Sequence, residues 1–503
     1  MSARKSLLAF VGVAALTAST LAFAPALLQN DAGEDGKALA VDAGALELTP
    51  EARANRLAAT AALENVPCVV GMAGPFACNN VDLVDVVPTA GFGAGHGSDS
   101  WGWTDDDGTE YVIVTSGVGT GFFRLLEDGT TEYLGTAERT DTADRVLWND
   151  VKVVNDHAYI TSEDNAFGLQ IVDLKQVAEL PAIPLGTGRG VIETAGRIIG
   201  DGAHNAVAFP ERDIIAMSLW RDDTAPEGRP TCASDLALFD VSDGNETDPV
   251  RLGCIDVPSG GEGSHDTACF VYAGPDADYN GAGPDRELGT DDDVPASDIC
   301  LTFQESAGVY AFDVSAVTRD KIVDGPIKMI NRWDYDAPYA HQGWFSENHR
   351  WIIFGDELDE SGALGSGDHL NTATYYIDAE DLDAGNENGE AEFPFPPQFN
   401  GDAVKVWTNP NTIAIDHNMY VVGNRVYQAN YGAGLRVLEY SDESLEAGGE
   451  GAFTEVAYFD TYPGPGPAEF YGAWNTYPFF ESGNIVLSDF ESGLLILDVT
   501  LED

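Results

Sequence analysis

A short phrase recurs along this chain and constrains its fold more than any other feature. The phrase is a small residue, usually Gly, followed by alternating apolar residues and closed by an acid. Its six clear copies and a degenerate seventh, which comes first in the chain, run over Gly168–Asp173, Asp235–Asp240, Gly308–Asp313, Thr374–Asp378, Gly434–Glu439, Gly493–Asp498 and Gly121–Glu127. Repetition on this scale indicates one supersecondary unit stacked many times. We expect the closing acids to cap strand ends.

A Trp or His stands upstream of each copy, at the head of another short strand. These heads are Trp101, Trp148, His204, His265, His341, His417 and Trp474. Each unit therefore contains at least two strands in addition to its turns. The spacing of heads and phrases predicts seven units, whereas six or eight remain compatible because units 2 to 5 carry irregular insertions.

The clearest unit begins at His417. Its segments 417–422, 425–430, 435–440 and 455–460 read as four short strands joined by turns rich in Gly and Asn. Such a sheet is apolar on both faces, so it needs neighbours on both sides. Seven such sheets packed radially bury those faces. The sequence therefore predicts an all-β fold: a seven-bladed β-propeller of four-stranded antiparallel blades.

The ends of the ring must also be closed. The last unit holds three strands, and Val81–Val87 is a strand without a unit of its own. We expect this N-terminal strand to pair with the last blade as its outer strand, which removes the open edge.

Three regions are expected along the chain. Residues 1–26 resemble a secretory signal peptide, with Arg4 and Lys5 before an apolar run and a cleavage motif at residues 24–26. The alternative is an uncleaved anchor helix. Residues 27–65 read as an acidic, Ala- and Gly-rich tether with a short helix beginning near Thr49. Residues 66–503 form the propeller.

The six Cys fit an exported protein. Their spacing favours the pairs Cys68 with Cys78, Cys232 with Cys254, and Cys269 with Cys300. Six Cys allow 15 connectivities, so the sequence leaves the pairing open.

Acids outnumber bases so strongly that the formal net charge is −59. Such a surface repels nucleic acid and anionic membranes, and we expect neither as a partner. The scarcity of Lys and abundance of Asp suggest a marine or halophilic source. We expect a monomer without a transmembrane span in the mature chain, whose partner is a protein, a glycan or a small ligand.

Several long segments carry a family resemblance. They are residues 101–114, 148–164, 264–281, 299–306, 339–360 and 416–441. Through them the chain resembles bacterial LVIVD-repeat proteins, in particular the secreted group called choice-of-anchor B, over residues 66–503. The resemblance implies an exported β-propeller, often held at the cell surface by varying anchors. It implies no reaction. No C-terminal anchor is evident, so secretion to the medium, attachment at the cell surface and periplasmic residence all stay open.

Four of the heads are histidines in successive units. If the first strand of each unit lines the channel, then His204, His265, His341 and His417 converge near one axis. Neutral imidazole is the commonest protein ligand for Zn, Cu and Fe. The sequence therefore offers a transition-metal site, against the alternative that each His bonds the backbone of the next unit.

A second candidate is an acidic loop. Its spacing fits the calcium-loop pattern, in which Gly281 supplies the sharp turn. The predicted calcium ligands are Asp276, Asp278, Asn280, Asp285 and Glu287. The preceding residues read as a strand rather than the helix of an EF-hand, so a solvated acidic turn is the alternative.

A third acidic run covers residues 356–360. We interpret it as a solvated loop or a weak cation site rather than a catalytic carboxylate pair.

Two function classes follow from the sequence. One is an exported, calcium-stabilised binding or structural scaffold, which we favour. The other is a metal-dependent enzyme, an oxidoreductase or hydrolase, that uses the axial His cluster.

Overall fold

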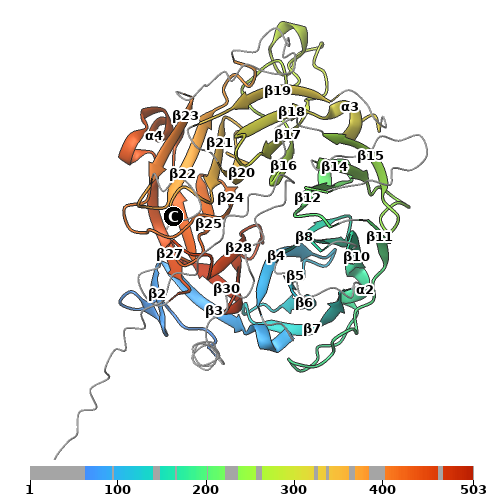
Figure 1. Ribbon diagram of the computed structural model, residues 1–503, viewed down its shortest axis with the longest axis vertical. Coiled ribbons are helices and arrows are strands. Elements are labelled where there is room, and N and C mark those ends of the chain that lie inside the picture. Colours follow the sequence, from blue (N-terminus) through green and yellow to red (C-terminus); the bar gives the residue numbers. More distant parts are fainter. Residues whose placement is uncertain are drawn as a thin grey trace, which may run out of the picture.

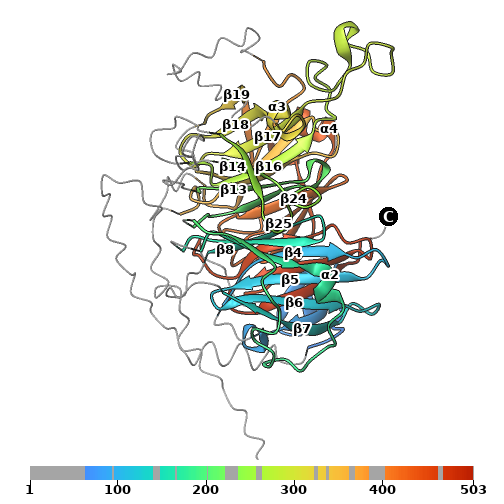
Figure 2. The ribbon, with the colours of Figure 1, turned by 90° about the vertical axis from the view of Figure 1, so that its right-hand side faces the viewer.

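The computed structural model describes residues 63–92, 96–139, 148–164, 167–200, 202–220, 236–255, 263–321, 327–335, 339–361, 369–384, 403–462 and 468–501. These residues form seven antiparallel sheets arranged as the blades of a ring (Figure 1). Figure 2 shows the same ring from its side. The predicted seven-bladed β-propeller is confirmed.

Each blade has four strands, which follow one another from the channel outwards. Blade 1 holds β4 (Gly97–Thr104), β5 (Glu110–Ser116), β6 (Gly119–Leu125) and β7 (Thr131–Glu138), and blade 2 holds β8 (Asn149–Val154), β9 (His157–Ser162), β10 (Leu169–Asp173) and β11 (Gly196–Ile198). Blade 3 holds β12 (Ala206–Phe209), β13 (Ile214–Ser218), β14 (Leu236–Asp240) and β15 (Val250–Ile255). Blade 4 holds β16 (Asp266–Val271), β17 (Asp298–Phe303), β18 (Val309–Asp313) and β19 (Lys328–Trp333).

The remaining blades follow the same order. Blade 5 holds β20 (Ala340–Phe345), β21 (Trp351–Asp356), β22 (Ala373–Asp378) and β23 (Val404–Thr408). Blade 6 holds β24 (Asn418–Val422), β25 (Arg425–Ala429), β26 (Leu435–Glu439) and β27 (Thr454–Asp460), and blade 7 holds β28 (Ala473–Tyr477), β29 (Asn484–Asp489), β30 (Gly493–Val499) and β3 (Val81–Val87). The described helices are short: α2 (Leu174–Ala178), α3 (Ser315–Thr318), α4 (Asp442–Ala447), η1 (Thr89–Phe92), η2 (Pro210–Arg212), η3 (Gly283–Asp285) and η4 (Gly449–Gly451).

The repeated phrase forms the third strand of every blade. Its opening Gly is needed where the fourth strand passes closely: Gly434 has φ +69°, and a Cβ there would lie 2.1 Å from the carbonyl oxygen of Phe459. Its closing acid caps the next turn, as where Asp173 Oδ1 accepts from the N–H of Gln176 and Asp313 Oδ1 from the N–H of Ser315. The expected capping role of these acids is confirmed at both positions.

The hydrophobic core lies between blades rather than within one of them. Leu435 and Val437 of blade 6 share a buried cluster with Leu495 and Leu497 of blade 7. Because each sheet packs on both faces, no blade could bury its apolar residues alone.

The ring closes as predicted. β3 pairs antiparallel with β30, with Val81 opposite Val499, and so completes blade 7 (blue beside red in Figure 1). The sequence did not reveal the hairpin of β1 (Met72–Ala73) and β2 (Phe76–Asn79), which pairs with β27 and extends that sheet to six strands. This hairpin covers a second strand edge next to the closure.

Two predicted disulfides are present, Cys68–Cys78 beside the added hairpin and Cys269–Cys300 between β16 and β17. Cys254 is also disulfide-bonded, and Cys232 lies outside the described residues.

The predicted signal peptide and the tether up to residue 62, with most of its helix, also lie outside the described residues. Among the described residues, no helix is long and apolar enough to cross a membrane.

Candidate metal centre

The four histidines stand at the beginnings of the innermost strands of blades 3 to 6. His265 and His417 directly precede β16 and β24, His341 is the second residue of β20, and His204 comes two residues before β12. First strands of neighbouring blades contact one another around the axis. The antiparallel order therefore places all four imidazoles at one end of the channel.

The imidazoles form a continuous row. The ring centroids are 4.2 Å apart for His204 and His265, 4.3 Å for His265 and His341, and 4.3 Å for His341 and His417. All four side chains are buried, with at most 6% of each residue exposed. The row ends at Trp474, whose ring lies 4.2 Å from that of His417.

Three glutamates accompany this row. Glu163 Oε1 lies 2.5 Å from His204 Nδ1, and Glu305 Oε1 lies 3.1 Å from His265 Nδ1. Glu357 lies between His341 and His417, with its carboxylate oxygens 3.7 and 3.8 Å from their Nε2 atoms. Sequence reasoning missed all three as partners. The signal that could have found them was an acid at the end of the second strand, after β9, β17 and β21.

The protonation states follow from burial and from these pairs. Burial is the largest single effect and disfavours the charge on His204, but the hydrogen bond to Glu163 and the negative charges around the ring together outweigh it and raise the pKa of the imidazole. Burial and the positive charge of His204 lower the pKa of His265 well below its usual value. Burial also lowers the pKa of His341 and of His417. Three of the four rings are therefore neutral near pH 7, which is the form that binds metals.

Burial shifts the pKa of the glutamates upwards, in the direction opposite to its effect on the histidines. Burial raises the pKa of Glu305 to about 7 and that of Glu357 to about 7. The Glu357 carboxylate is held in place by the Tyr431 hydroxyl, which donates to Oε1 over 2.5 Å. These acids are poised between the protonated and ionised forms, so a nearby positive charge would hold them ionised.

The spacing of ligand atoms suits one metal ion. Ligand atoms of His265, His341 and Glu357 all lie within 4.8 Å of one another. His204 Nε2 and His265 Nε2 are 2.9 Å apart, a hydrogen-bond distance that is also close to the separation of about 3 Å between two ligands held at right angles by one ion at about 2.1 Å from each. His341 Nδ1 is buried without a hydrogen-bond partner. The arrangement can hold a metal, or a proton shared between His204 and His265.

Trp101 does not belong to this row, which corrects its expected position as the head of unit 1. It lies in an aromatic group with Tyr477 and Tyr420, at centroid distances of 5.0 and 5.6 Å. Those two residues follow Trp474 and His417 by three positions, so Ser98 is the equivalent of a head in blade 1. The bulge between Gly97 and Ser100 matches the one between Ala340 and Gly343 in β20, so Trp101 is the equivalent of Trp344.

A cavity of about 500 Å³ opens at the aromatic group. Its aromatic lining is Trp101, Trp103, Phe270, Trp344, Tyr420, Tyr477 and Phe479. Its polar lining includes Lys152, Asp266 and Gln342. Asp266 directly follows His265 in the sequence, and Gln342 directly follows His341. Lys152 Nζ donates to Asp99 over 3.1 Å and also to Asp150, so its charge is neutralised inside the protein. The cavity suits a small, mainly apolar molecule.

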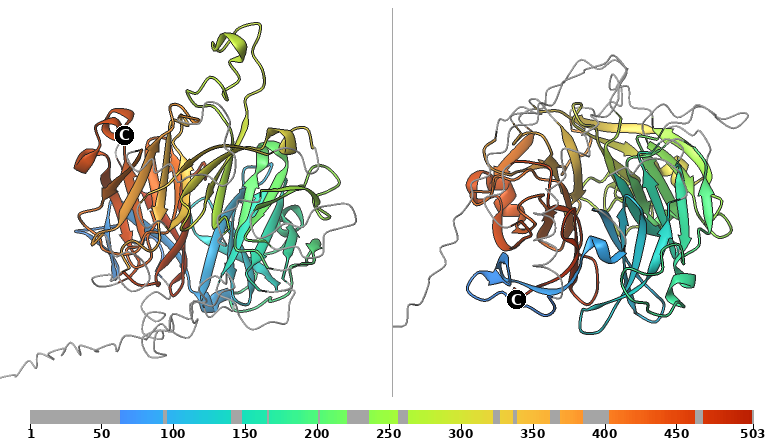
Figure 3. Two further views of the ribbon diagram at one scale, coloured as in Figure 1. Left: turned by 45° about the horizontal axis from the view of Figure 1, so that its top comes forward. Right: turned by 60° about the horizontal axis from the view of Figure 1, so that its bottom comes forward.

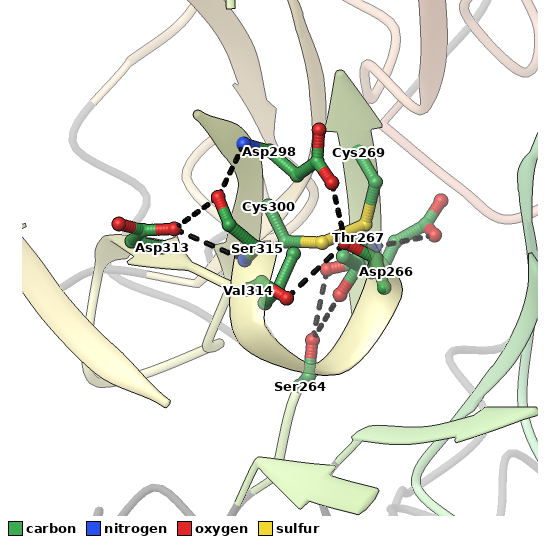
Figure 4. Close-up of a disulfide and its surroundings, with 10 residues drawn as sticks. Ser264, Asp266, Thr267, Cys269, Asp298, Cys300, Asp313, Val314 and Ser315 are labelled. Atoms are coloured by element: carbon green, nitrogen blue, oxygen red, sulfur yellow. Dashed lines mark hydrogen bonds between the residues drawn. A yellow bond between two sulfur atoms is a disulfide. The ribbon is translucent and has the colours of Figure 1, made fainter. Parts of the chain in front are cut away.

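Local structure holds His265 in place. The Ser264 hydroxyl is bonded to Thr267 Oγ1 over 2.7 Å and donates to the carbonyl oxygen of Asp266 over 3.0 Å. Further along the strand, the Cys269–Cys300 disulfide ties β16 to β17 (Figure 4). The strand that presents His265 is thus anchored on both sides of the imidazole.

The predicted calcium loop lies elsewhere, in the segment between β16 and β17 that projects from the ring (Figure 3). Its five residues do not converge: Asp278 pairs with Arg286, Asn280 bonds the backbone of Gly274 and Ala282, and Asp285 and Glu287 are exposed. Asp276 instead lies with Asp381 and Asp383 of the next blade, with ligand atoms within 4.8 Å of one another.

The acidic run 356–360 is buried, which corrects the expectation of a solvated loop. Asp356, Glu357, Asp359 and Glu360 are each at most 8% exposed. The run follows β21, and β21 runs antiparallel to β20, so it returns to the same end of the blade as His341.

No protein-family model matches this chain, and no curated protein sequence matches it. The β-propeller fold is therefore shown by the structure alone, and the similarity to LVIVD-repeat proteins rests on the segments named from the sequence.

Proposed function

We propose that this protein binds a transition-metal ion at the axial cluster of His204, His265, His341 and His417 and acts as a metal-dependent enzyme. The observation that carries the proposal is the convergence of His265, His341 and Glu357, whose buried ligand atoms lie within 4.8 Å of one another. Imidazole ligands favour Zn, Cu, Fe or Ni over hard cations. Fe or Cu bound there would supply redox chemistry, whereas Zn would supply hydrolysis.

The surrounding residues have distinct roles in this proposal. Glu163 and Glu305 accept hydrogen bonds from Nδ1 of His204 and His265, which turns each Nε2 towards the shared site. The carbonyl oxygen of Trp474 does the same for His417, at 2.6 Å from Nδ1. In the metal-free protein a proton is held between His204 and Glu163, and metal binding would release it.

The substrate in this proposal is a small, mainly apolar molecule. The aromatic-lined cavity would hold it, and Asp266 and Gln342 connect the cavity lining to the strands that carry His265 and His341. Burial raises the pKa of Asp266 to about 7, so this carboxyl group can exchange a proton near neutral pH.

The test is elemental analysis by mass spectrometry on untagged protein purified without chelators. We expect about one equivalent of Fe, Cu or Zn, lost in the double variant His265→Gln/His341→Gln. The control is His157→Gln, a histidine on β9 whose Nδ1 bonds the carbonyl oxygen of Asn155 in its own turn. Absence of a transition metal after growth with each of the three metals would refute the proposal, as would equal metal content in the double variant.

A second candidate is an exported, calcium-stabilised binding scaffold of the LVIVD-repeat, choice-of-anchor B type. The aromatic cavity and the two described disulfides favour it, because neither requires a metal in the channel. Calcium would lie at Asp276, Asp381 and Asp383. Thermal-shift screening of metal-free protein against glycans and small apolar molecules tests this function. A hit that survives His265→Gln/His341→Gln but not Trp344→Ala would support it.

Export can be tested separately. If residues 1–26 are a signal peptide, the intact mass of protein recovered from the medium or cell surface should begin after Ala26. An intact N-terminus in exported material would contradict cleavage there.

A further inference from the structure

A separate cluster of carboxylates lies beside the histidine row. Asp359 and Glu360 come from the loop after β21, and Asp416 comes from the residue before His417. Their ligand atoms lie within 4.8 Å of one another, and Asp416 has no exposed surface. None of these three residues takes part in the proposed channel centre.

Several of these oxygens have no hydrogen-bond partner although they are buried. They are Asp416 Oδ1 and Oδ2, Asp359 Oδ1 and Glu360 Oε2. The remaining oxygens are occupied: Tyr375 donates to Asp359 Oδ2 over 2.7 Å, and the N–H of Ala373 donates to Glu360 Oε1 over 2.7 Å. The occupied oxygens fix the orientation of both side chains, and the two carboxyl groups can bond each other only when one of them is protonated. An unpaired buried carboxylate is costly, so this arrangement calls for a ligand.

Asp416 is exceptional at its position. Four of the other heads are preceded by small residues, Ala203, Ser264, Ala340 and Ala473, and Trp148 is preceded by Leu147. The Asp416 carboxylate fits because Gly355 lacks a side chain, since a Cβ at Gly355 would lie 1.9 Å from Asp416 Oδ2. Both the acid and the space for it are therefore specific to this place in the ring.

Positive charge is nearly absent around the cluster. Asp356 lies beside it, bonded by the Tyr335 hydroxyl and the N–H of Tyr339. Among the described residues, the base that pairs with these acids is His369, whose Nε2 is 4.0 Å from Asp359 Oδ2. Burial first, and then the neighbouring carboxylates, raise the pKa of Asp416 and of Glu360 well above the usual range. Without a cation, these acids must take up protons.

We propose that Asp359, Glu360 and Asp416 bind one Ca²⁺ ion. Calcium is held by oxygen ligands at about 2.3–2.6 Å, so two oxygens on the same ion can be up to about 5 Å apart. The ligand atoms of Asp359, Glu360 and Asp416 lie within 4.8 Å of one another and meet this condition. Mg²⁺ is less suitable because it keeps several waters, and the buried carboxylates leave little room for them. Calcium at this place is distinct from the exposed acidic loop and does not depend on the proposed enzyme function.

The site would also brace the channel. Asp416 adjoins His417, and Glu357 belongs to the same run as Asp359 and Glu360. A cation there fixes the run after β21 and hence the position of the Glu357 carboxylate between His341 and His417.

The test uses full-length protein stripped with a chelator and then titrated with Ca²⁺, followed by melting temperature and by Tb³⁺ luminescence excited through tyrosine. We expect Ca²⁺ to raise the melting temperature of the wild type. Asp359→Asn and Asp416→Asn should each weaken Ca²⁺ binding by more than about tenfold, because loss of outer-sphere partners alone costs that much. Asp276→Asn should leave that binding unchanged, as should His265→Gln/His341→Gln.

Two outcomes would overturn the proposal. One is a Ca²⁺-dependent rise that persists in both Asp359→Asn and Asp416→Asn, which would place calcium elsewhere. The other is a stripped wild type that gains nothing from Ca²⁺ and binds no Tb³⁺, which would mean that protons alone neutralise the cluster. If Asp416→Asn fails to fold, Asp359→Asn decides the matter, because Tyr375 can still donate to its amide oxygen.

Discussion

Two acidic segments on neighbouring blades look alike in sequence and reach opposite environments. Asp278, Asp285 and Glu287 are exposed on a loop that projects from the ring, whereas Asp359 and Glu360 are buried beside the channel. The first loop connects β16 to β17 and lies at the end of blade 4 away from His265. The second connects β21 to β22 and lies at the end of blade 5 that carries His341.

This difference shows that strand order, not local composition, decides whether an acid in this protein is solvated. In an antiparallel blade the end of the second strand returns to the start of the first. Acids after the second strand therefore enter the histidine end of the channel. Glu163 and Glu305 follow the same rule in blades 2 and 4.

The largest expected contrast between the two segments is in pH dependence. Burial raises the pKa of Asp359 to about 7 in the folded protein, against about 3.9 in the unfolded chain. The folded form holds the extra proton, so this contribution to stability is present below about pH 4 and is lost as the pH rises through 7. In chelated protein the loss should reach at most about 4 kcal/mol.

Urea unfolding of chelated protein between pH 4 and 8 measures this effect. Asp359→Asn should flatten the decline, whereas Asp285→Asn in the exposed loop should follow the wild-type profile. Identical profiles for Asp359→Asn and the wild type would show that Asp359 is ionised in the metal-free protein.

A second contrast concerns the room for an added Cβ atom at a glycine in each segment. Gly355→Ala should destabilise the protein by about 3 kcal/mol, because its Cβ would overlap the Asp416 carboxylate. Gly289→Ala in the exposed loop meets no atom within 4 Å and should cost about 1 kcal/mol, through its φ of +88° alone. Chemical denaturation of both variants provides the comparison. Equal costs would mean that Asp416 can move away at little expense.

The smallest contrast concerns single polar contacts. Tyr375→Phe removes the hydroxyl that donates to buried Asp359 and should cost about 2 kcal/mol. Arg286→Ala removes an ion pair with Asp278 in which both side chains are more than half exposed, so it should cost less than about 0.5 kcal/mol. Melting temperatures in calcium-free buffer measure both changes. A larger loss for Arg286→Ala would contradict the assignment of the two environments.

Much of the fold was predictable because it is written in short-range patterns. Alternating apolar residues and Gly turns define each strand, and the number of phrases equals the number of blades. The closing role of Val81–Val87 was predictable because the last blade lacked a fourth strand. Trp101 was misplaced because Ser98 fills the position of the head in blade 1, so the first aromatic residue of β4 is the equivalent of Trp344 in β20.

The candidate sites were only partly predictable. The histidine row was indicated because four successive units begin with a histidine. Residues at equivalent positions in successive blades approach one axis, and the four rings do so. Glu357 and Asp416 could not be assigned in this way, because their burial depends on which end of the blade they reach and on the gap left by Gly355.

The sequence by itself favoured seven blades, indicated the strand that closes the ring and pointed to a row of four histidines, because periodicity is a local property that stacking preserves. Tertiary structure alone decided which of the 84 acids are taken out of water. Burial of a carboxylate is set by the neighbouring blade and by the end of the channel it faces, and those partners are distant in the sequence. That is why two similar acidic segments differ in charge state, in stability and in the cations they can hold.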